Sequence, residues 1–209
     1  NERMTPTWYF DFISPFAYLQ WQRLKSLGVT VQPVPILFAG VLDHLGHKGP
    51  AEMTEKRRFT YRHVQFEAER RGLRFRFPDA HPFNPLSALR LAIALDAKPD
   101  VVDAIFAQIW GHGGSTDDFT ALARGFDIDD VAAAIARDEV KARLRTNTEA
   151  AIARGVFGVP TLVIDEALFW GDDATAMALA YRDDPGLFER DEYVRIDALP
   201  MASMRKAAG

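Results

Sequence analysis

Ser14 is the residue of this chain whose type and position best fit a chemical role. It follows an apolar stretch and directly precedes Pro15. Proline is well tolerated at the first position of a helix, because the amide hydrogen that it lacks would have no partner there. Ser14 is therefore expected at a helix N-terminus, where free backbone amides and the helix dipole favour an anion. Its hydroxyl could donate to such an anion, or it could be an ordinary cap for the first-turn amides.

A sulfur anion is the natural candidate for that position. Thioredoxin-like folds carry Cys-x-x-Cys at such a corner, whereas residues 14–17 read Ser-Pro-Phe-Ala and the chain has no cysteine. It therefore has no sulfur of its own for disulfide exchange. A helix N-terminus lowers the pKa of a thiol from its free value of about 8.5, so a thiolate brought by another molecule is reasonable there. Glutathione is the first cofactor to consider.

The segment GVFGVPT at residues 155–161 contains the second candidate feature. A proline directly before an apolar strand often marks a special backbone. The Val159–Pro160 bond could be cis, as in thioredoxin-like folds, where a cis-proline lies opposite the helix start. Pro160 could also be a trans proline that merely starts the strand. With a cis bond, the backbone of Val159 could pair with an extended peptide such as glutathione, as an added strand would.

The elements that would position Ser14 form a β-α-β unit. Residues 7–12 and 29–36 are predicted as strands because both are rich in β-branched or aromatic side chains. Residues 15–27 are predicted as a helix that Gly28 ends. This order favours a parallel pair of strands with a right-handed crossover.

Strand character returns after residue 155. Residues 161–164 and 167–170 outline a two-residue hairpin, and a last helix is expected from near Asp172. Between the two strand regions, apolar residues recur at helical spacing, with one long charged helix over residues 53–71 and another that Asn84 caps and Pro85 begins as a first-turn proline. The fold class is therefore α/β, with an all-helical insertion. The predicted units are a discontinuous domain of residues 1–37 and 155–209 and an insertion of residues 38–154.

The composition narrows the class of protein. At 209 residues and 48% apolar content, the chain can form one compact unit with a sizeable core. The net charge of −4 argues against nucleic acid and against an acidic membrane surface as partners. No apolar run approaches the roughly 18 residues of a membrane-spanning helix, and residues 1–6 do not resemble a secretory signal. We therefore expect a cytoplasmic protein. The histidines lack His-Glu-x-x-His spacing, so no metal site is expected.

Five stretches in order along the chain resemble the 2-hydroxychromene-2-carboxylate isomerases. These enzymes are relatives of the kappa-class glutathione transferases in the DsbA-type branch of the thioredoxin superfamily. The resemblance implies a thioredoxin-like domain (β-α-β … β-β-α) with a helical insertion, glutathione as cofactor, and a homodimer. The stretches are FDFISPFAYL (10–19), GPAE (49–52) with KRR (56–58), PFNP (82–85), GVFGVPT (155–161) and FWGDD (169–173).

The resemblance also implies roles in binding glutathione. Ser14 matches the catalytic serine, which donates a hydrogen bond to the glutathione sulfur. Lys56 falls where kappa-class enzymes keep a lysine for the glycyl carboxylate, and His47 where they keep an asparagine; each could instead be a surface side chain. Asp173 matches the acid that meets the γ-glutamyl ammonium, although the helix dipole favours a first-turn carboxylate anyway. Trp170 is expected either to wall the site or to pack in the core.

Two residues near Asp173 depart from the family pattern. Asp172 stands where serine, asparagine or glutamine is frequent, and Ala174 where arginine is frequent. The added negative charge and the lost cation should weaken capture of the γ-glutamyl carboxylate, although backbone amides at the helix start could still hold it. The acceptor pocket is expected in the insertion, with aromatics that could equally be core residues and an asparagine that could be a helix cap. Its candidate walls are Phe38, Tyr61, His81, Phe83, Asn84 and Trp110.

Three functions are compatible with these residues. The first is a glutathione-dependent isomerase that acts on conjugated keto acids from aromatic degradation by reversible addition of a thiolate. The second is a kappa-like glutathione transferase or peroxidase, which would consume the thiol. The third is a non-catalytic thioredoxin-like binding module, in which the departures at Asp172 and Ala174 have abolished cofactor binding.

Overall fold

A four-stranded sheet forms the centre of the computed structural model, which describes residues 4–47 and 53–203. The strand order is β2-β1-β3-β4; β1 pairs in parallel with β2 and antiparallel with β3, and β3 pairs antiparallel with β4. The predicted parallel pair and the predicted hairpin are both confirmed. The strands are β1 (Thr7–Phe10), β2 (Gln32–Pro35), β3 (Thr161–Ile164) and β4 (Ala167–Trp170).

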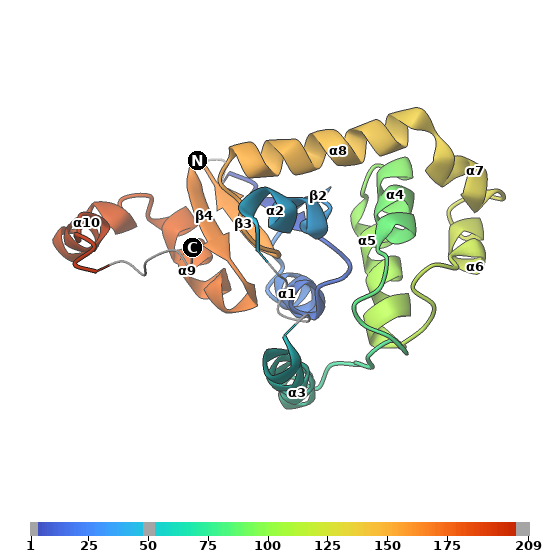
Figure 1. Cartoon of the computed structure of the whole chain (residues 1–209), viewed down its shortest axis with the longest axis horizontal. Helices are drawn as coiled ribbons and strands as arrows, with labels where there is room; N and C mark the ends of the chain where they lie inside the picture. Colours follow the sequence, from blue (N-terminus) through green and yellow to red (C-terminus); the bar gives the residue numbers. More distant parts are fainter. Residues whose placement is uncertain (1–3, 48–52, 204–209) are drawn as a thin grey trace, which may run out of the picture.

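Helices surround this sheet (Figure 1). The helix α1 (Pro15–Ser26) joins β1 to β2 and begins at Pro15 as predicted. Between β2 and β3, the described residues form helices and no strand. These are α2 (Phe38–Leu45), α3 (Thr54–Arg70), α4 (Leu86–Ala94), α5 (Pro99–Phe106), the π-helix η2 (Ala107–Gly111), α6 (Thr120–Arg124), α7 (Val131–Ala136) and α8 (Asp138–Ala153). After β4 come η3 (Asp172–Ala174), α9 (Thr175–Asp183), η4 (Leu187–Glu189) and α10 (Asp191–Asp197).

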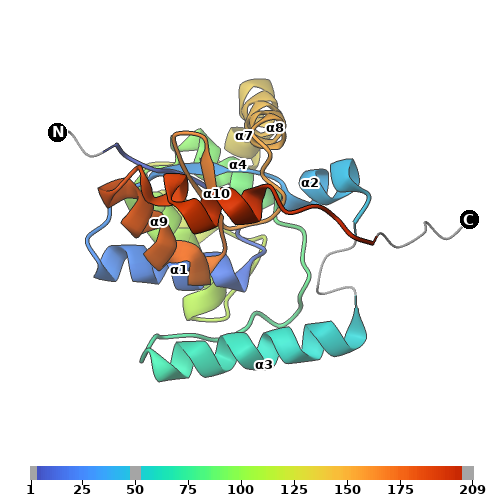
Figure 2. The same cartoon turned by 90° about the vertical axis from the view of Figure 1, so that its left-hand side faces the viewer.

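Alternation along β1 sends side chains to two apolar clusters, one on each face of the sheet. Trp8 and Phe10 belong to the larger cluster, which includes residues of α1, α4, α5 and α9. Tyr9 belongs to the smaller one, with residues of α2 and α8. Trp8 and Phe10 stack with ring centroids 4.5 Å apart, and Phe10 lies 5.7 Å from Phe106 of the insertion. The insertion therefore shares one core with the sheet. Helix α3 runs next to α1 (Figure 2) and contributes the fully buried Val64 and Ala68 to that core.

Four sequence predictions need correction. The strand predicted over residues 29–36 spans only Gln32–Pro35, because the Val29 amide still bonds the Leu24 carbonyl at the end of α1, at 2.9 Å. The strand predicted over residues 7–12 ends at Phe10, because the next residues form a turn in which the Ser14 amide bonds the Asp11 carbonyl at 3.1 Å. The helix α4 begins at Leu86, so Pro85 precedes it and Asn84 accepts the Leu86 amide at 3.0 Å. The helix that starts after Asp172 is not the last one, since α10 follows it. Within the described ranges, no helix has the length and apolar character needed to cross a membrane.

Candidate active site

Ser14 caps the N-terminus of α1 and is almost fully buried. Its Oγ accepts a hydrogen bond from the Ala17 amide at 3.2 Å, so the capping role is confirmed. Accepting this bond uses a lone pair of the hydroxyl and not its hydrogen. That hydrogen has no acceptor among the residues that the structure describes, so Ser14 can cap the helix and still donate to an anion.

Asp11, three residues before Ser14, is a site residue that the sequence analysis missed. Its side chain is completely buried, and its two carboxylate oxygens accept the amides of Ile13 (3.0 Å) and Phe38 (2.9 Å). Burial raises the pKa of Asp11 to about 7, against the lowering effect of these two donors. The carboxyl group thus ties the serine corner to the start of α2. A charged residue inside the apolar run FDF was the available signal, since such a residue is rarely buried without specific partners.

Two ring nitrogens of the insertion hold the same corner from the other side. Trp110 Nε1 donates to the Phe12 carbonyl at 2.7 Å, and His81 Nε2 lies 2.7 Å from the Ile13 carbonyl. Trp110 is fully buried, so the prediction that it forms a wall of the acceptor pocket is replaced by a role as a core residue that anchors the corner. Every backbone unit from Asp11 to Ser14 is therefore fixed by a tertiary contact or a turn.

Three of the other predicted pocket residues lie together beside this corner. Tyr61, His81 and Phe83 are half-buried, with ring centroids 5.3 Å apart for Tyr61 and His81 and 5.9 Å for His81 and Phe83. Phe38 instead packs against the smaller apolar cluster, on the other face of the sheet. Asn84 is exposed, and its side-chain oxygen accepts a hydrogen bond from the Leu86 amide.

The loop before β3 brings the second candidate feature to the same end of the sheet. The Val159–Pro160 bond is cis. Tyr9 pairs with Thr161, so the end of β1, which leads to Ser14, lies beside the start of β3, which follows Pro160. Neither the N–H nor the C=O of Val159 forms a backbone hydrogen bond within the described part of the chain, whereas the Gly158 carbonyl accepts the Thr161 hydroxyl at 2.7 Å. The loop can therefore offer unpaired backbone groups next to the serine corner.

Trp170 is a surface residue at the end of β4, with 56% of its area exposed, so the core-packing alternative is wrong. Its ring meets Phe157 edge-on, with centroids 5.2 Å apart. A side chain at Gly158 would come within 2.5 Å of the Trp170 indole nitrogen, which means that the indole covers the backbone of the Val159 loop.

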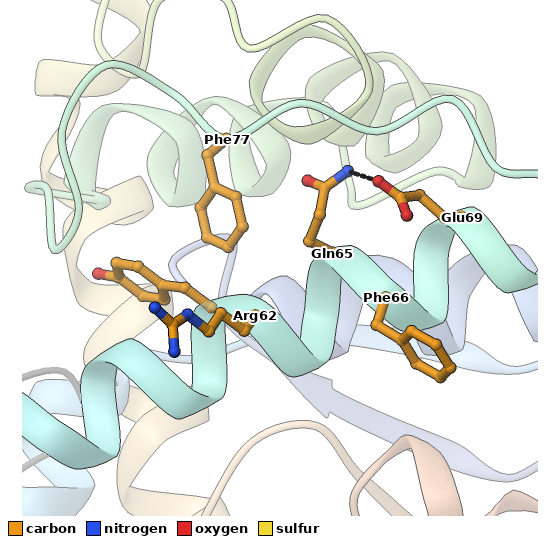
Figure 3. Close-up of a pocket in the computed structure, with 6 residues that line it drawn as sticks. Arg62, Gln65, Phe66, Glu69 and Phe77 are labelled. Carbon is orange, nitrogen blue, oxygen red and sulfur yellow. Dashed lines mark hydrogen bonds between the residues drawn. The ribbon is translucent and has the colours of Figure 1, made fainter.

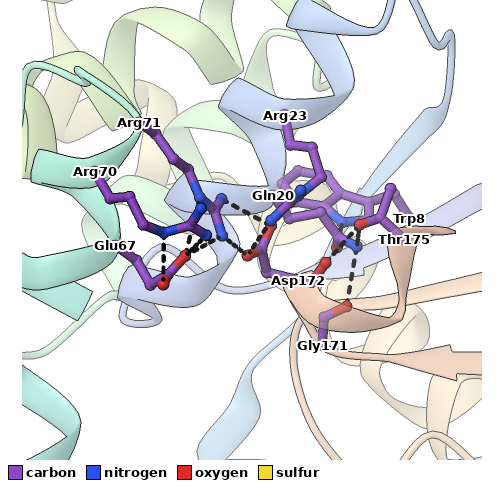
Figure 4. Close-up of polar contacts among 9 residues, drawn as sticks. All are labelled: Trp8, Gln20, Arg23, Glu67, Arg70, Arg71, Gly171, Asp172 and Thr175. Carbon is purple, nitrogen blue, oxygen red and sulfur yellow. Dashed lines mark hydrogen bonds and ion pairs between the residues drawn. The ribbon is translucent and has the colours of Figure 1, made fainter. Parts of the chain in front are cut away.

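The helix start at residues 171–175 is fixed from the core by Gln20 (Figure 4). Gln20 accepts the Trp8 indole N–H at 2.7 Å and donates to the Gly171 carbonyl at 3.1 Å and to the Thr175 hydroxyl at 2.9 Å. The Thr175 hydroxyl in turn donates to the Asp172 carbonyl at 2.7 Å. These contacts hold the backbone amides that could bind a carboxylate.

Asp172 does not present a free negative charge there. Its buried carboxylate pairs with Arg23 at 2.9 Å and with Arg71, at the end of α3, at 2.6 Å. Burial opposes ionisation of Asp172, but the bonds and charges of the two guanidinium groups outweigh it and hold its pKa below the usual value. The extra charge expected to weaken cofactor binding is thus neutralised, and Arg71 also pairs with Glu67 at 3.0 Å (Figure 4).

The other predicted cofactor contacts are surface side chains. Asp173, Lys56 and His47 are all exposed. Residues 49–52, which carry part of the family resemblance, lie outside the described residues. The structure leaves the predicted roles of these residues as predictions.

A shallow depression runs along α3 and shares only Tyr61 with the residues described above (Figure 3). Phe77 closes one side of it against the Tyr61 ring, with centroids 4.8 Å apart. Neither Ser14 nor the Val159 loop lines it, so we define the site by its polar groups and not by this depression. The lining residues are Tyr61, Arg62, Gln65, Phe66, Glu69 and Phe77.

The Asp172 ion pairs give a first prediction. Asp172→Asn should lower the free energy of unfolding by about 2 kcal/mol at pH 7, because it removes the counter-charge of the partly exposed Arg23 and leaves Arg71 with Glu67 alone. The loss should shrink as the pH falls, since a carboxyl with a lowered pKa contributes stability above its unfolded pKa and loses it in acid. Urea unfolding measures it. Asp173→Asn, at the exposed neighbour, is the matched control and should change little.

Comparison with known proteins agrees with this geometry. The protein-family model of the DSBA-like thioredoxin domain matches residues 7–181 of this chain. The fold and the site therefore define a thioredoxin-like protein of the DsbA type, with serine in place of the first cysteine.

Individual relatives narrow the class further. The 2-hydroxychromene-2-carboxylate isomerase of Pseudomonas putida is 30% identical over 186 residues, which cover 83% of this chain and 92% of that protein. The solved structure of a 2-hydroxychromene-2-carboxylate isomerase has a TM-score of 0.75 and 28% identity, covering 88% of this chain and 99% of that one. Glutathione S-transferase kappa 2 of Caenorhabditis elegans is 27% identical over 185 residues, with coverages of 78% and 82%. The chain belongs to the family of the 2-hydroxychromene-2-carboxylate isomerases, and its class of enzyme is isomerase.

Proposed function

We propose that the chain is a glutathione-dependent isomerase that acts on a conjugated aromatic keto acid or its cyclic hemiketal, such as 2-hydroxychromene-2-carboxylate. The observation that carries the proposal is the Ser14 hydroxyl at the start of α1, whose hydrogen has no acceptor among the described residues, in a chain without cysteine. A DsbA-type corner without its own sulfur fits a sulfur anion supplied by a cofactor. The names of the relatives supply the substrate and the cofactor class.

The residues of this corner fit glutathione at three points. The Ser14 hydroxyl and the positive end of the α1 dipole can stabilise a thiolate. The unpaired backbone of Val159 can bind the peptide in the manner of an added strand. The amides of Asp172 and Asp173, in the turn whose Gly171 carbonyl Gln20 holds, can bind a carboxylate.

When bound, glutathione would supply a thiolate. Once the hemiketal ring opens by cleavage of its C–O bond to give a phenol and a conjugated keto acid, reversible addition of that thiolate to the double bond would leave a single bond that can rotate before the thiolate is eliminated. Ser14 contributes by holding negative charge on the sulfur whenever the sulfur is free. The fixed corner keeps the hydroxyl in one place, so that it need not reorganise during the reaction. The thiol is regenerated in each cycle and none is consumed.

Isomerisation of 2-hydroxychromene-2-carboxylate, followed by absorbance with and without glutathione, tests the proposal. We expect a rate only with glutathione, a constant thiol concentration and one product isomeric with the substrate. Loss of thiol to conjugates or to oxidised glutathione would show instead the kappa-like transferase or peroxidase. Calorimetry that finds no glutathione binding up to about 5 mM, together with no turnover, would show a non-catalytic module. We further propose that the protein is a cytoplasmic homodimer. Sedimentation of the purified protein tests its oligomeric state.

A further inference from the structure

Arg57, Tyr61 and His81 form a connected polar cluster beside the serine corner. Arg57 Nε donates to the Tyr61 hydroxyl at 3.1 Å, and Arg57 Nη2 donates to the His81 carbonyl at 3.1 Å. The Tyr61 hydroxyl lies 2.5 Å from His81 Nδ1. The guanidinium also lies over the Tyr61 ring, 4.7 Å from its centroid. These contacts fix a flexible arginine side chain in one orientation.

The proton positions in this cluster follow from the acceptor at its inner end. A carbonyl oxygen can only accept, so His81 Nε2 carries the hydrogen that meets the Ile13 carbonyl. In the neutral ring Nδ1 is then an acceptor for the Tyr61 hydroxyl, whose hydrogen the His81 carbonyl also accepts at 3.0 Å. Burial lowers the pKa of His81, which favours this neutral form. The cluster therefore adds no second positive charge beside Arg57.

The charge of Arg57 has no carboxylate partner within the described ranges. By contrast, Arg58 pairs with Glu55 at 3.3 Å, and Arg70 and Arg71 pair with Glu67. A guanidinium has more N–H groups than the two that Tyr61 and His81 use, and its fork shape suits a planar carboxylate. Arg57 is thus oriented but not neutralised.

The position of the cluster places this charge on the acceptor side of the site. His81 bonds the carbonyl of Ile13, the residue directly before Ser14. His63, one turn and a half along α3 from Arg57, meets the ring of Phe16 at the start of α1, with centroids 6.0 Å apart. The arginine therefore lies near the reacting end of α1, on the insertion side.

We propose that Arg57 binds the carboxylate of the substrate, with Tyr61 and His81 as the positioning residues that orient it. The assignment rests on the proposed function for its substrate class, a conjugated aromatic keto acid. Arg57 was not among the predicted site residues, because a single arginine in the run KRR has no distinguishing spacing. It makes the enzyme specific for acids over their neutral esters.

Binding of benzylidenepyruvate, a conjugated aromatic keto acid, and of its methyl ester tests the assignment by calorimetry. The wild-type protein should bind the acid about 10- to 100-fold more tightly than the ester. Arg57→Gln should lose most of this preference with unchanged glutathione affinity, and Arg57→Lys should keep part of it, since a lysine lacks the fork. Arg58→Gln, which removes the neighbouring paired arginine, is the matched control and should bind like the wild type.

The outcomes separate this assignment from the proposed function. The assignment would be overturned if wild type and Arg57→Gln preferred the acid over the ester equally. It would also be overturned if Arg58→Gln lost this preference as much as Arg57→Gln, since that would show a general effect of surface charge. A failure of the isomerase itself would appear as absent turnover while the binding difference at Arg57 persists. Tyr61→Phe adds a readout of orientation. In the isomerisation assay it should raise KM for the acid substrate and leave KM for the corresponding ester unchanged.

Discussion

Ser14→Ala should lower kcat/KM for the glutathione-dependent isomerisation by about 100- to 1,000-fold, the usual effect of removing one donor from a developing charge in a fixed site. The hydroxyl hydrogen of Ser14 is the group expected to meet the sulfur, and its oxygen is held by the Ala17 amide. Without it, the pKa of bound glutathione should rise toward that of a free thiol. Thiolate absorbance across a pH titration measures the pKa, and initial rates measure kcat/KM.

The capping role of Ser14 requires a matched variant. Alanine at the cap costs about 1 kcal/mol of stability, whereas glycine costs only a few tenths. Ser14→Gly therefore removes the donor and leaves α1 nearly as stable as in the wild type. If both variants lose activity equally, the loss belongs to the donor. Full activity in Ser14→Gly, with an unchanged thiol pKa, would contradict the role of the hydroxyl.

Local sequence was sufficient for the elements that carry Ser14. Pro15 marked the helix start, and the aromatic and β-branched residues on either side of α1 marked β1 and β2, which the structure confirms. Such features act within a few residues of one another, and they leave a spacing that can be read in the chain. The family resemblance then supplied the thioredoxin-like fold that the domain match shows.

The contacts that hold the site in place could not be predicted in this way. Arg71 and Asp172 are separated by 101 positions, and Trp110 and Phe12 by 98. Pairs this far apart meet only because the insertion folds back over α1, and neither residue carries a periodic signal for its partner. The expectation that Asp172 weakens cofactor binding arose for this reason, since its two cations lie on other elements.

Asp11 is the buried group whose ionisation should matter most for stability. Its pKa is raised from about 3.8 in the unfolded chain to about 7 in the folded protein, so the folded state holds the proton more tightly. The stability that protonation contributes is fully present below about pH 4 and is lost as the pH rises through about 7. Asp11→Asn has no such proton. Between pH 4 and pH 8, the wild type should therefore lose about 4 kcal/mol in free energy of unfolding relative to the variant.

Urea unfolding of both proteins at several pH values measures this shift. For Asp172→Asn, the difference in free energy of unfolding from the wild type should change with pH in the opposite direction. The pKa of Asp172 is lowered in the folded protein, so its comparison with wild type should move in favour of the wild type as the pH rises. Opposite slopes of these differences against pH would show that the two buried carboxyl groups contribute to stability in different protonation states. Asp172 would act as an ion that binds α3 to η3, and Asp11 as a group whose proton is retained by burial. A flat difference for Asp11→Asn would mean that the Ile13 and Phe38 amides keep Asp11 ionised throughout, and that the serine corner is held by a charge.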